Sequence, residues 1–175
     1  MSRPCDLDAI EARRLIGNKK LSPLELTKSC IEQIEKLNPS INAVVAINNA
    51  DILKQAKKAE DDVMNGSELG LLHGLPVGIK DLNIVKNLRS TSGSKIYENR
   101  IPESDDTIVE DIRSEGAIIF CKTNTPEFGA GGNTKNFVYG ATSNPFDVTK
   151  TPAGSSGGSA AALACNICLL YTSDA

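Results

Sequence analysis

Two serines set among glycines form the segment whose residue types most directly suggest chemistry. Residues 151–160 read Thr-Pro-Ala-Gly-Ser-Ser-Gly-Gly-Ser-Ala, with Ser155 and Ser156 at the centre and an alanine-rich run behind them. Flanking glycines let the backbone adopt unusual dihedral angles and approach a ligand, which favours hydroxyls presented for catalysis. A flexible loop and a phosphate cradle on a helix N-terminus are the alternatives, although the Gly-Lys-Ser/Thr ending of a P-loop is absent.

A lysine near the end of an apolar strand is the second candidate. Lys80 lies in residues 75–81, which read Leu-Pro-Val-Gly-Ile-Lys-Asp. Burial disfavours the charged form of a lysine, and an amine that is neutral near pH 7 can act as a base. The alternative is a solvated lysine beside Asp81.

Other reactive residues fit their patterns less well. Residues 92–95 match the Ser-x-x-Lys of penicillin-recognising enzymes, but the companion Ser-Asp-Asn and Lys-Thr-Gly are absent, and only residues 122–124, Lys-Thr-Asn, come close. We therefore expect Lys95 at the surface. His73 is the only histidine, and no Gly-x-Ser-x-Gly elbow accompanies it, so we interpret it as a structural turn residue.

The five cysteines predict neither a disulfide framework nor a metal site. Their number is odd and their spacing is irregular. Cys165 and Cys168 match Cys-x-x-Cys, but a small-residue helical run precedes them where a redox motif needs a strand. A single histidine argues against a mixed Cys/His zinc site, so we expect no metal.

The elements that must position these residues alternate between helix and strand. Residues 22–25, Ser-Pro-Leu-Glu, form a helix start, and Asn38-Pro39 is expected to end that helix. Asp105-Asp106 is expected to cap a later one. We predict helices over residues 6–17, 22–38, 49–64, 105–116 and 159–164, strands over 41–47, 75–81 and 117–120, and irregular loops over 90–104 and 125–158. A helix followed by a buried strand is typical of α/β folds.

Composition excludes several classes of protein. The 175 residues carry a net charge of -3, with 40% apolar and 23% charged residues, which rules out collagen-like and wholly disordered chains and fits one domain. A slightly acidic chain is a poor candidate for binding nucleic acid directly. The sequence has no apolar run of the roughly 18–20 residues that span a membrane and no apolar signal core near its start. We expect a cytoplasmic, soluble protein.

Taken in order, several segments resemble the amidase signature family. The resemblance covers about residues 6 to 164 and rests on the ordered set of segments rather than on one of them. They are 73–81 (His-Gly-Leu-Pro-Val-Gly-Ile-Lys-Asp), 91–94 (Thr-Ser-Gly-Ser), 116–119 (Gly-Ala-Ile-Ile), 122–124 (Lys-Thr-Asn), 127–128 (Glu-Phe), 140–142 (Gly-Ala-Thr), 144–147 (Asn-Pro-Phe-Asp) and 153–162. The implied fold is α/β, a mixed twisted sheet flanked by helices, of which this chain would hold the N-terminal part.

The resemblance also implies a Lys–Ser–Ser mechanism without a metal or organic cofactor. Lys80 would be the base, and Ser155, preceded by a cis peptide bond, would relay a proton to it from a nucleophilic serine. Ser156 is expected to bind substrate. The family usually has glycine where this chain has Ala153. The loop that resembles the family's substrate-pocket lining consists of Gly129, Ala130, Gly131, Gly132 and Asn133.

The nucleophile is the main departure from the family. Family members carry it in a Gly-Gly-Ser motif about two dozen residues after the bridging serine, and no Gly-Gly precedes Ser173. Residues 168–175, Cys-Leu-Leu-Tyr-Thr-Ser-Asp-Ala, resemble the translation of a sequencing-library adapter. We therefore expect amidase-domain sequence over residues 1–167 and a non-native tail over 168–175. A chance likeness to the family's own Leu-Gly-Ser-Asp segment is the alternative.

These observations predict that the parent protein hydrolyses the C–N bond of a small carboxylic amide. The full-length parent could form a homodimer. One alternative is the glutaminase-type part of a glutamyl/aspartyl-tRNA(Gln/Asn) amidotransferase, although residues 123–133 look more like general amidases. The other is a catalytically inactive fragment, because the expected nucleophile is missing from these residues.

Overall fold

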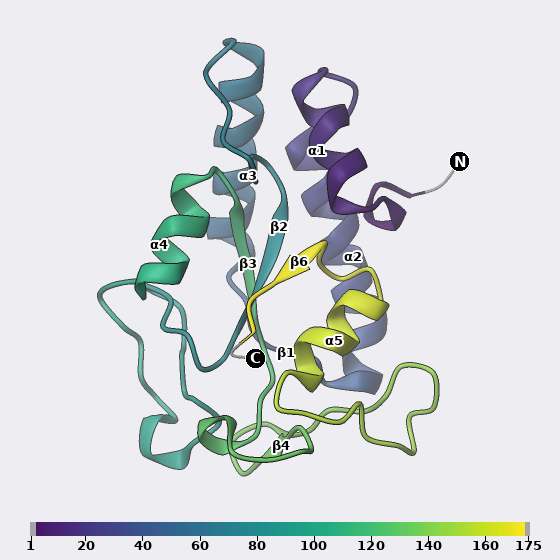
Figure 1. The fold of residues 1–175 in the computed structure, drawn as a ribbon, viewed down its shortest axis with the longest axis vertical. Helices are drawn as coiled ribbons and strands as arrows, with labels where there is room; N and C mark the ends of the chain where they lie inside the picture. Colours follow the sequence, from purple (N-terminus) through teal and green to yellow (C-terminus); the bar gives the residue numbers. More distant parts are fainter. Residues whose placement is uncertain (1–2, 174–175) are drawn as a thin grey trace.

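Helices enclose a small central sheet in the computed structural model, which describes residues 3–173 (Figure 1). The helices are α1 (Ala9–Gly17), α2 (Pro23–Ile41), α3 (Asn49–Met64), α4 (Thr107–Ser114) and α5 (Gly157–Ala164), with 3-10 turns at Pro4–Asp6, Lys95–Tyr97 and Glu127–Gly129. The strands are β1 (Val44–Ala46), β2 (Pro76–Lys80), β3 (Ile118–Thr123), β4 (Lys135–Asn136), β5 (Gly140–Ala141) and β6 (Leu170–Tyr171).

The main sheet has the strand order β1-β3-β2-β6. β1 runs antiparallel to β3, whereas β2 is parallel to both β3 and β6. The predicted mixed sheet is therefore confirmed. β4 and β5 form a separate two-stranded hairpin.

Helices cover both faces of this sheet, as predicted. Ile118 and Phe120 of β3 join a large apolar core with α1, α2, α3 and α5. Ile119 points the other way and packs with Val109 of α4 in a smaller cluster. Strands that are buried on both faces have continuous apolar sequences, and such runs over residues 75–81 and 117–120 are what predicted β2 and β3.

The helix that begins after Ser22 starts as predicted but ends later. The Ser22 hydroxyl accepts hydrogen bonds from the backbone N–H groups of Leu24 and Glu25, at 3.0 and 3.2 Å. Pro39 does not end α2, which continues to Ile41 before Asn42 adopts a left-handed conformation at φ 49°. Proline in the last turn forfeits one intrahelical hydrogen bond, whereas the bond from Asn42 N to the carbonyl of residue 38 still closes the helix.

Three further local expectations are corrected. The strand predicted over 41–47 is only β1, because α2 extends into its start. The strand predicted over 117–120 continues to Thr123, where it pairs with both neighbours. The Asp106 side chain does not cap α4; it accepts a hydrogen bond from Ile84 N at 2.7 Å and so ties down a loop.

Within residues 3–173, no helix is both long enough and apolar enough to cross a membrane.

Candidate active site

Lys80 is the last residue of β2 and is completely buried. β2 lies between β3 and β6, so both of its backbone edges are paired and its five residues are all buried. The apolar run before Lys80 is what places the strand in the core and delivers an amine to the strand's C-terminal end. A solvated lysine, the alternative left open by the sequence, is therefore wrong.

The two central serines lie at the N-terminus of α5, beside the end of β2. Lys80 Nζ lies 2.8 Å from Ser155 Oγ and 3.0 Å from Ser156 Oγ. The Gly154–Ser155 peptide bond is cis, as the resemblance implies. The glycine-serine segment is thus neither a free loop nor a P-loop; it brings two hydroxyls to one buried amine.

Small residues let α5 sit close enough for this contact. A Cβ atom on Gly158 would lie 2.4 Å from the backbone N and O of Asn124, directly after β3. The neighbouring Ser159 hydroxyl lies 2.6 Å from Thr123 Oγ1. Helix α5 is therefore docked against the end of β3, which holds the serines over Lys80.

The arrangement suits proton transfer. Burial penalises an ammonium ion, and a hydroxyl can either donate to or accept from a neutral amine. A serine between an amine and a third group can pass a proton along without moving far. Lys80, Ser155 and Ser156 therefore form one hydrogen-bonded cluster at the end of β2.

A cleft of about 490 Å³ is lined by residues of the segment 126–141, and neither Ser155 nor Ser156 belongs to its lining. A Cβ atom on Gly154 would lie 3.1 Å from backbone atoms of Asn133 and Gly131, so the loop that holds these two residues packs directly against the serine segment. The lining of the cleft includes Ala130, Gly131, Gly132 and Asn133. Gly129 falls in a 3-10 turn outside that lining, and Ser156 binds Lys80 directly.

Ser173 lies at the same site. Its hydroxyl is 2.7 Å from Ser156 Oγ, so a third serine approaches the pair. Residues 174 and 175, the end of the segment that resembles an adapter, lie outside the described residues.

Sequence reasoning missed a buried ion pair behind Lys80. Lys122 Nζ lies 3.1 Å from Asp81 Oδ1, and neither side chain has any solvent exposure. Two signals were available: an aspartate directly after the candidate lysine, and a lysine extending an apolar strand. Neither shows that the two side chains meet.

The competing candidates keep structural roles. Lys95 is exposed and pairs with Glu98 at 3.3 Å. His73 is buried at a turn, where Nε2 lies 3.0 Å from the carbonyl oxygen of Ala59. Burial raises the pKa of Cys165, which together with Cys168 forms no disulfide. Within residues 3–173, no group of histidine, cysteine or acidic side chains is arranged to hold a metal ion.

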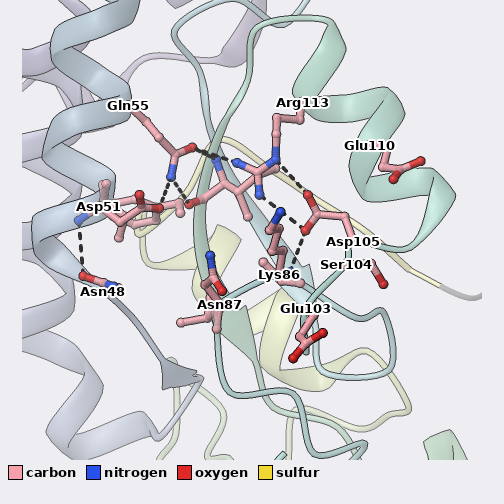
Figure 2. Close-up of a pocket in the computed structure, with 15 residues that line it drawn as sticks. Asn48, Asp51, Gln55, Lys86, Asn87, Glu103, Ser104, Asp105, Glu110 and Arg113 are labelled. Carbon is pink, nitrogen blue, oxygen red and sulfur yellow. Dashed lines mark hydrogen bonds and ion pairs between the residues drawn. The ribbon is translucent and has the colours of Figure 1, made fainter. Parts of the chain in front are cut away.

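A second cleft, of about 630 Å³, lies between α3 and α4 (Figure 2). Its central groups bond to one another: Arg113 Nε lies 3.0 Å from Asp105 Oδ2, and Gln55 Nε2 lies 2.7 Å from Asp51 Oδ2. The Gln55 amide also accepts a hydrogen bond from Ile119 N on β3 at 3.0 Å. These contacts fasten α3 and α4 to the sheet, and we assign the cleft a structural role.

Three comparisons with known proteins agree on one family. The family model described as Amidase matches residues 25–172. The A subunit of the glutamyl-tRNA(Gln) amidotransferase of Acaryochloris marina is 41% identical over 152 residues, which are 87% of this chain and 32% of that protein.

Solved structures with the same fold point to the same family. A structure described as "Crystal structure of amidase" has 33% identity and a TM-score of 0.86 over 93% of this chain and 37% of its own. A bacterial aryl acylamidase has 32% identity and a TM-score of 0.86, over 93% and 34% respectively. The chain therefore spans about a third of the length of the relatives it matches.

Proposed function

The chain belongs to the amidase signature family, and from that premise we propose that it supplies the base and the bridging serine of an amide-hydrolysing site. The observation that carries the proposal is the distance of 2.8 Å between the fully buried amine of Lys80 and the hydroxyl of Ser155. The substrate is a small molecule with a carboxylic amide bond.

The proposed reaction has two halves. Neutral Lys80 takes the Ser155 proton while Ser155 takes the proton of a nucleophilic serine, whose oxygen attacks the amide carbonyl. The C–N bond then breaks, and the amine or ammonia leaves with the proton returned through Ser155. Water, deprotonated by the same relay, attacks the acyl-serine ester. The ester C–O bond then breaks, the serine oxygen takes the proton back through Ser155, and the carboxylic acid leaves.

The nucleophile belongs, in this proposal, to a continuation of the chain. The family spacing places it at about position 179, in a segment whose backbone N–H groups would also stabilise the oxyanion. The shared fold and the partial coverage of relatives support this proposal.

We also propose that residues 168–175 are adapter-derived. The match of the Amidase model through residue 172, the burial of Cys168 and the pairing of β6 with β2 favour the alternative, a likeness to the family's own segment, and the DNA decides between the two. Re-reading the DNA after codon 167 tests it: codons that differ from the adapter, or an independent assembly that continues this way, would refute it.

The catalytic proposal is tested on the protein made from the complete coding sequence at this locus. Lys80→Met and Ser155→Ala are each expected to lower kcat on a hydrolysable amide by about 10²–10⁴-fold, the usual contribution of a positioned acid or base. Lys95→Met is the matched control, since Lys95 is exposed and pairs only weakly with Glu98. Activity that survives Lys80→Met would reject this mechanism.

A role in a tRNA-dependent amidotransferase is the second candidate, favoured by one observation. The relative in Acaryochloris marina is named as the A subunit of a glutamyl-tRNA(Gln) amidotransferase. Glutamine-dependent amidation of glutamyl-tRNA by the complete protein with neighbouring gene products would establish this reading. Hydrolysis of simple amides without any partner protein would favour the amidase.

A further inference from the structure

Two fully buried lysines lie near the C-terminal ends of the paired strands β2 and β3, and their hydrogen-bond partners differ. Lys80 Nζ meets the hydroxyls of Ser155 and Ser156. Lys122 pairs with Ile79, whereas Lys80 pairs with Thr123, so the two lysines lie one register position apart along the paired strands. A buried amine lowers the stability of the fold unless hydrogen-bond partners compensate for its lost hydration, so the partners of each lysine are considered separately.

Three acceptors surround the Lys122 amine. Nζ donates to the carbonyl oxygen of Asn83, to Ser90 Oγ at 3.0 Å and to Asp81 Oδ1 at 3.1 Å. An ammonium group has three N–H bonds, and a carboxylate among their acceptors favours the charged form. Burial lowers the pKa of Lys122, and the charge of Asp81 opposes that shift. The three acceptors, one of them a carboxylate, suit an ammonium group at Lys122, whereas Lys80 meets two hydroxyls.

Asp81, the acidic partner of Lys122, is itself held by Thr91. Its carboxylate accepts from Thr91 N at 3.1 and 3.2 Å and from Thr91 Oγ1 at 2.7 Å. The ion pair thus holds both ends of the loop that follows Lys80, at Asn83 on one side and at Ser90 and Thr91 on the other. Breaking one partner would leave a buried charge without compensation.

The segment that follows this loop contacts the lining of the cleft of about 490 Å³. Just beyond Thr91, the carbonyl oxygen of Ser92 accepts from Phe128 N at 2.8 Å, and Ser94 Oγ donates to Glu127 Oε1 at 2.7 Å. Glu127 lines the cleft. The contacts therefore run from Lys122 through one loop to the wall of the proposed substrate site.

We propose that Lys122 is a positioning residue for amide hydrolysis, acting through its buried ion pair with Asp81 to hold the loop between Lys80 and the cleft. This inference rests on the proposed function. Lys122 itself need not touch substrate; it keeps the base and the cleft wall in one geometry, and misplacement by about 1 Å can cost about a hundredfold in rate.

The test separates positioning from folding with two variants of the complete protein. In Lys122→Met, kcat per active site, counted by titration with a serine-directed fluorophosphonate, is expected to fall between about tenfold and a hundredfold. In the double variant Asp81→Asn/Lys122→Met no charge is left unpaired, so the thermal midpoint should recover towards that of wild type. The rate per site should stay low, because nothing ties Asn83 to Ser90.

The matched control is the exposed pair Lys150–Asp147, whose atoms lie 3.4 Å apart. Lys150→Met and Lys150→Met/Asp147→Asn should change neither the rate nor the midpoint.

The outcomes are distinguishable. An unchanged rate per site in Lys122→Met overturns the inference, as does a double variant that regains both rate and stability. A double variant that does not fold assigns the pair to folding alone and also overturns it. If wild type hydrolyses no amide, or Lys80→Met stays active, the proposed function fails instead.

Discussion

Ala153 occupies a backbone conformation that suits glycine. Its φ is 64°, in the left-handed region, where a Cβ atom crowds the backbone. Its carbonyl oxygen accepts from Thr134 N at 3.1 Å and from Thr134 Oγ1 at 2.9 Å, which holds the residue in place. The departure from the family's usual glycine therefore has a structural cost just before the serine pair.

Ala153→Gly should therefore stabilise the protein. We expect the free energy of unfolding to rise by about 0.5–1 kcal/mol, the relief of left-handed strain less the added entropy of the unfolded chain. Urea unfolding measures it. Ala160→Gly, at an exposed position in α5, is the control and should lower the same quantity by about 1 kcal/mol. Changes of the same sign in both variants would contradict this account.

The buried thiols should be chemically inert. Burial raises the pKa of Cys30 and that of Cys121, so little reactive thiolate forms, whereas Cys165 is partly exposed. At pH 8, peptide mapping after brief alkylation should find Cys165 modified before Cys30 or Cys121. Urea-unfolded protein, in which all five thiols are accessible, is the reference. Equal rates for the three in native protein would show that the core opens readily.

At the scale of elements, the docking of α5 on β3 controls where the serines lie. Gly158 permits that approach, since any side chain there would meet the backbone of Asn124. Gly131 and Asn133, in the loop after the 3-10 turn, pack against Gly154 of the serine segment. The site is thus assembled where one helix start, two strand ends and one loop converge.

Gly158→Ala tests this docking. The added methyl cannot fit 2.4 Å from Asn124 N, so α5 must shift, at a cost of about 3 kcal/mol in the free energy of unfolding. Chemical denaturation of the complete protein measures the loss. Gly132→Ala adds the same methyl where no atom lies within 4 Å and should leave stability nearly unchanged. Similar losses in both variants would show that close packing at Gly158 is not the cause.

At the scale of the whole molecule, the sheet keeps two outer strands, β1 and β6. The surface also carries large aromatic side chains, among them Phe137 and Phe146, each 86% exposed. Open strand edges and exposed aromatic residues favour association with other chains.

Residues 1–175 expressed alone should therefore fold poorly. We expect a broad thermal transition with binding of a hydrophobic dye at 25 °C, and no hydrolysis of simple amides. Calorimetry and dye fluorescence measure both properties, with the complete protein as the reference. A sharp, cooperative transition without dye binding would contradict the expectation about folding. Turnover that disappears in Lys80→Ala would contradict the expectation about activity.

The sequence by itself determined the features that depend on neighbouring residues. Ser22 and Pro23 mark a helix start because capping involves only the next three residues. Apolar runs predict β2 and β3 because burial on both faces removes the polar alternation of a surface strand. The residue types of Lys80 and Ser155 suggested their chemistry, and the ordered segments indicated the family.

Only the tertiary structure decided which of these residues meet. Lys80 and Ser155 are 75 positions apart in sequence, and no local pattern reports their 2.8 Å contact. A local rule treats Pro39 as a stop, but α2 continues past it, because the loss of one intrahelical hydrogen bond is followed by the bond from Asn42 N to the carbonyl oxygen of residue 38. Lys122 and Asp81 form an ion pair because two strand ends and a returning loop enclose them, and burial of that kind exists only once the chain has folded.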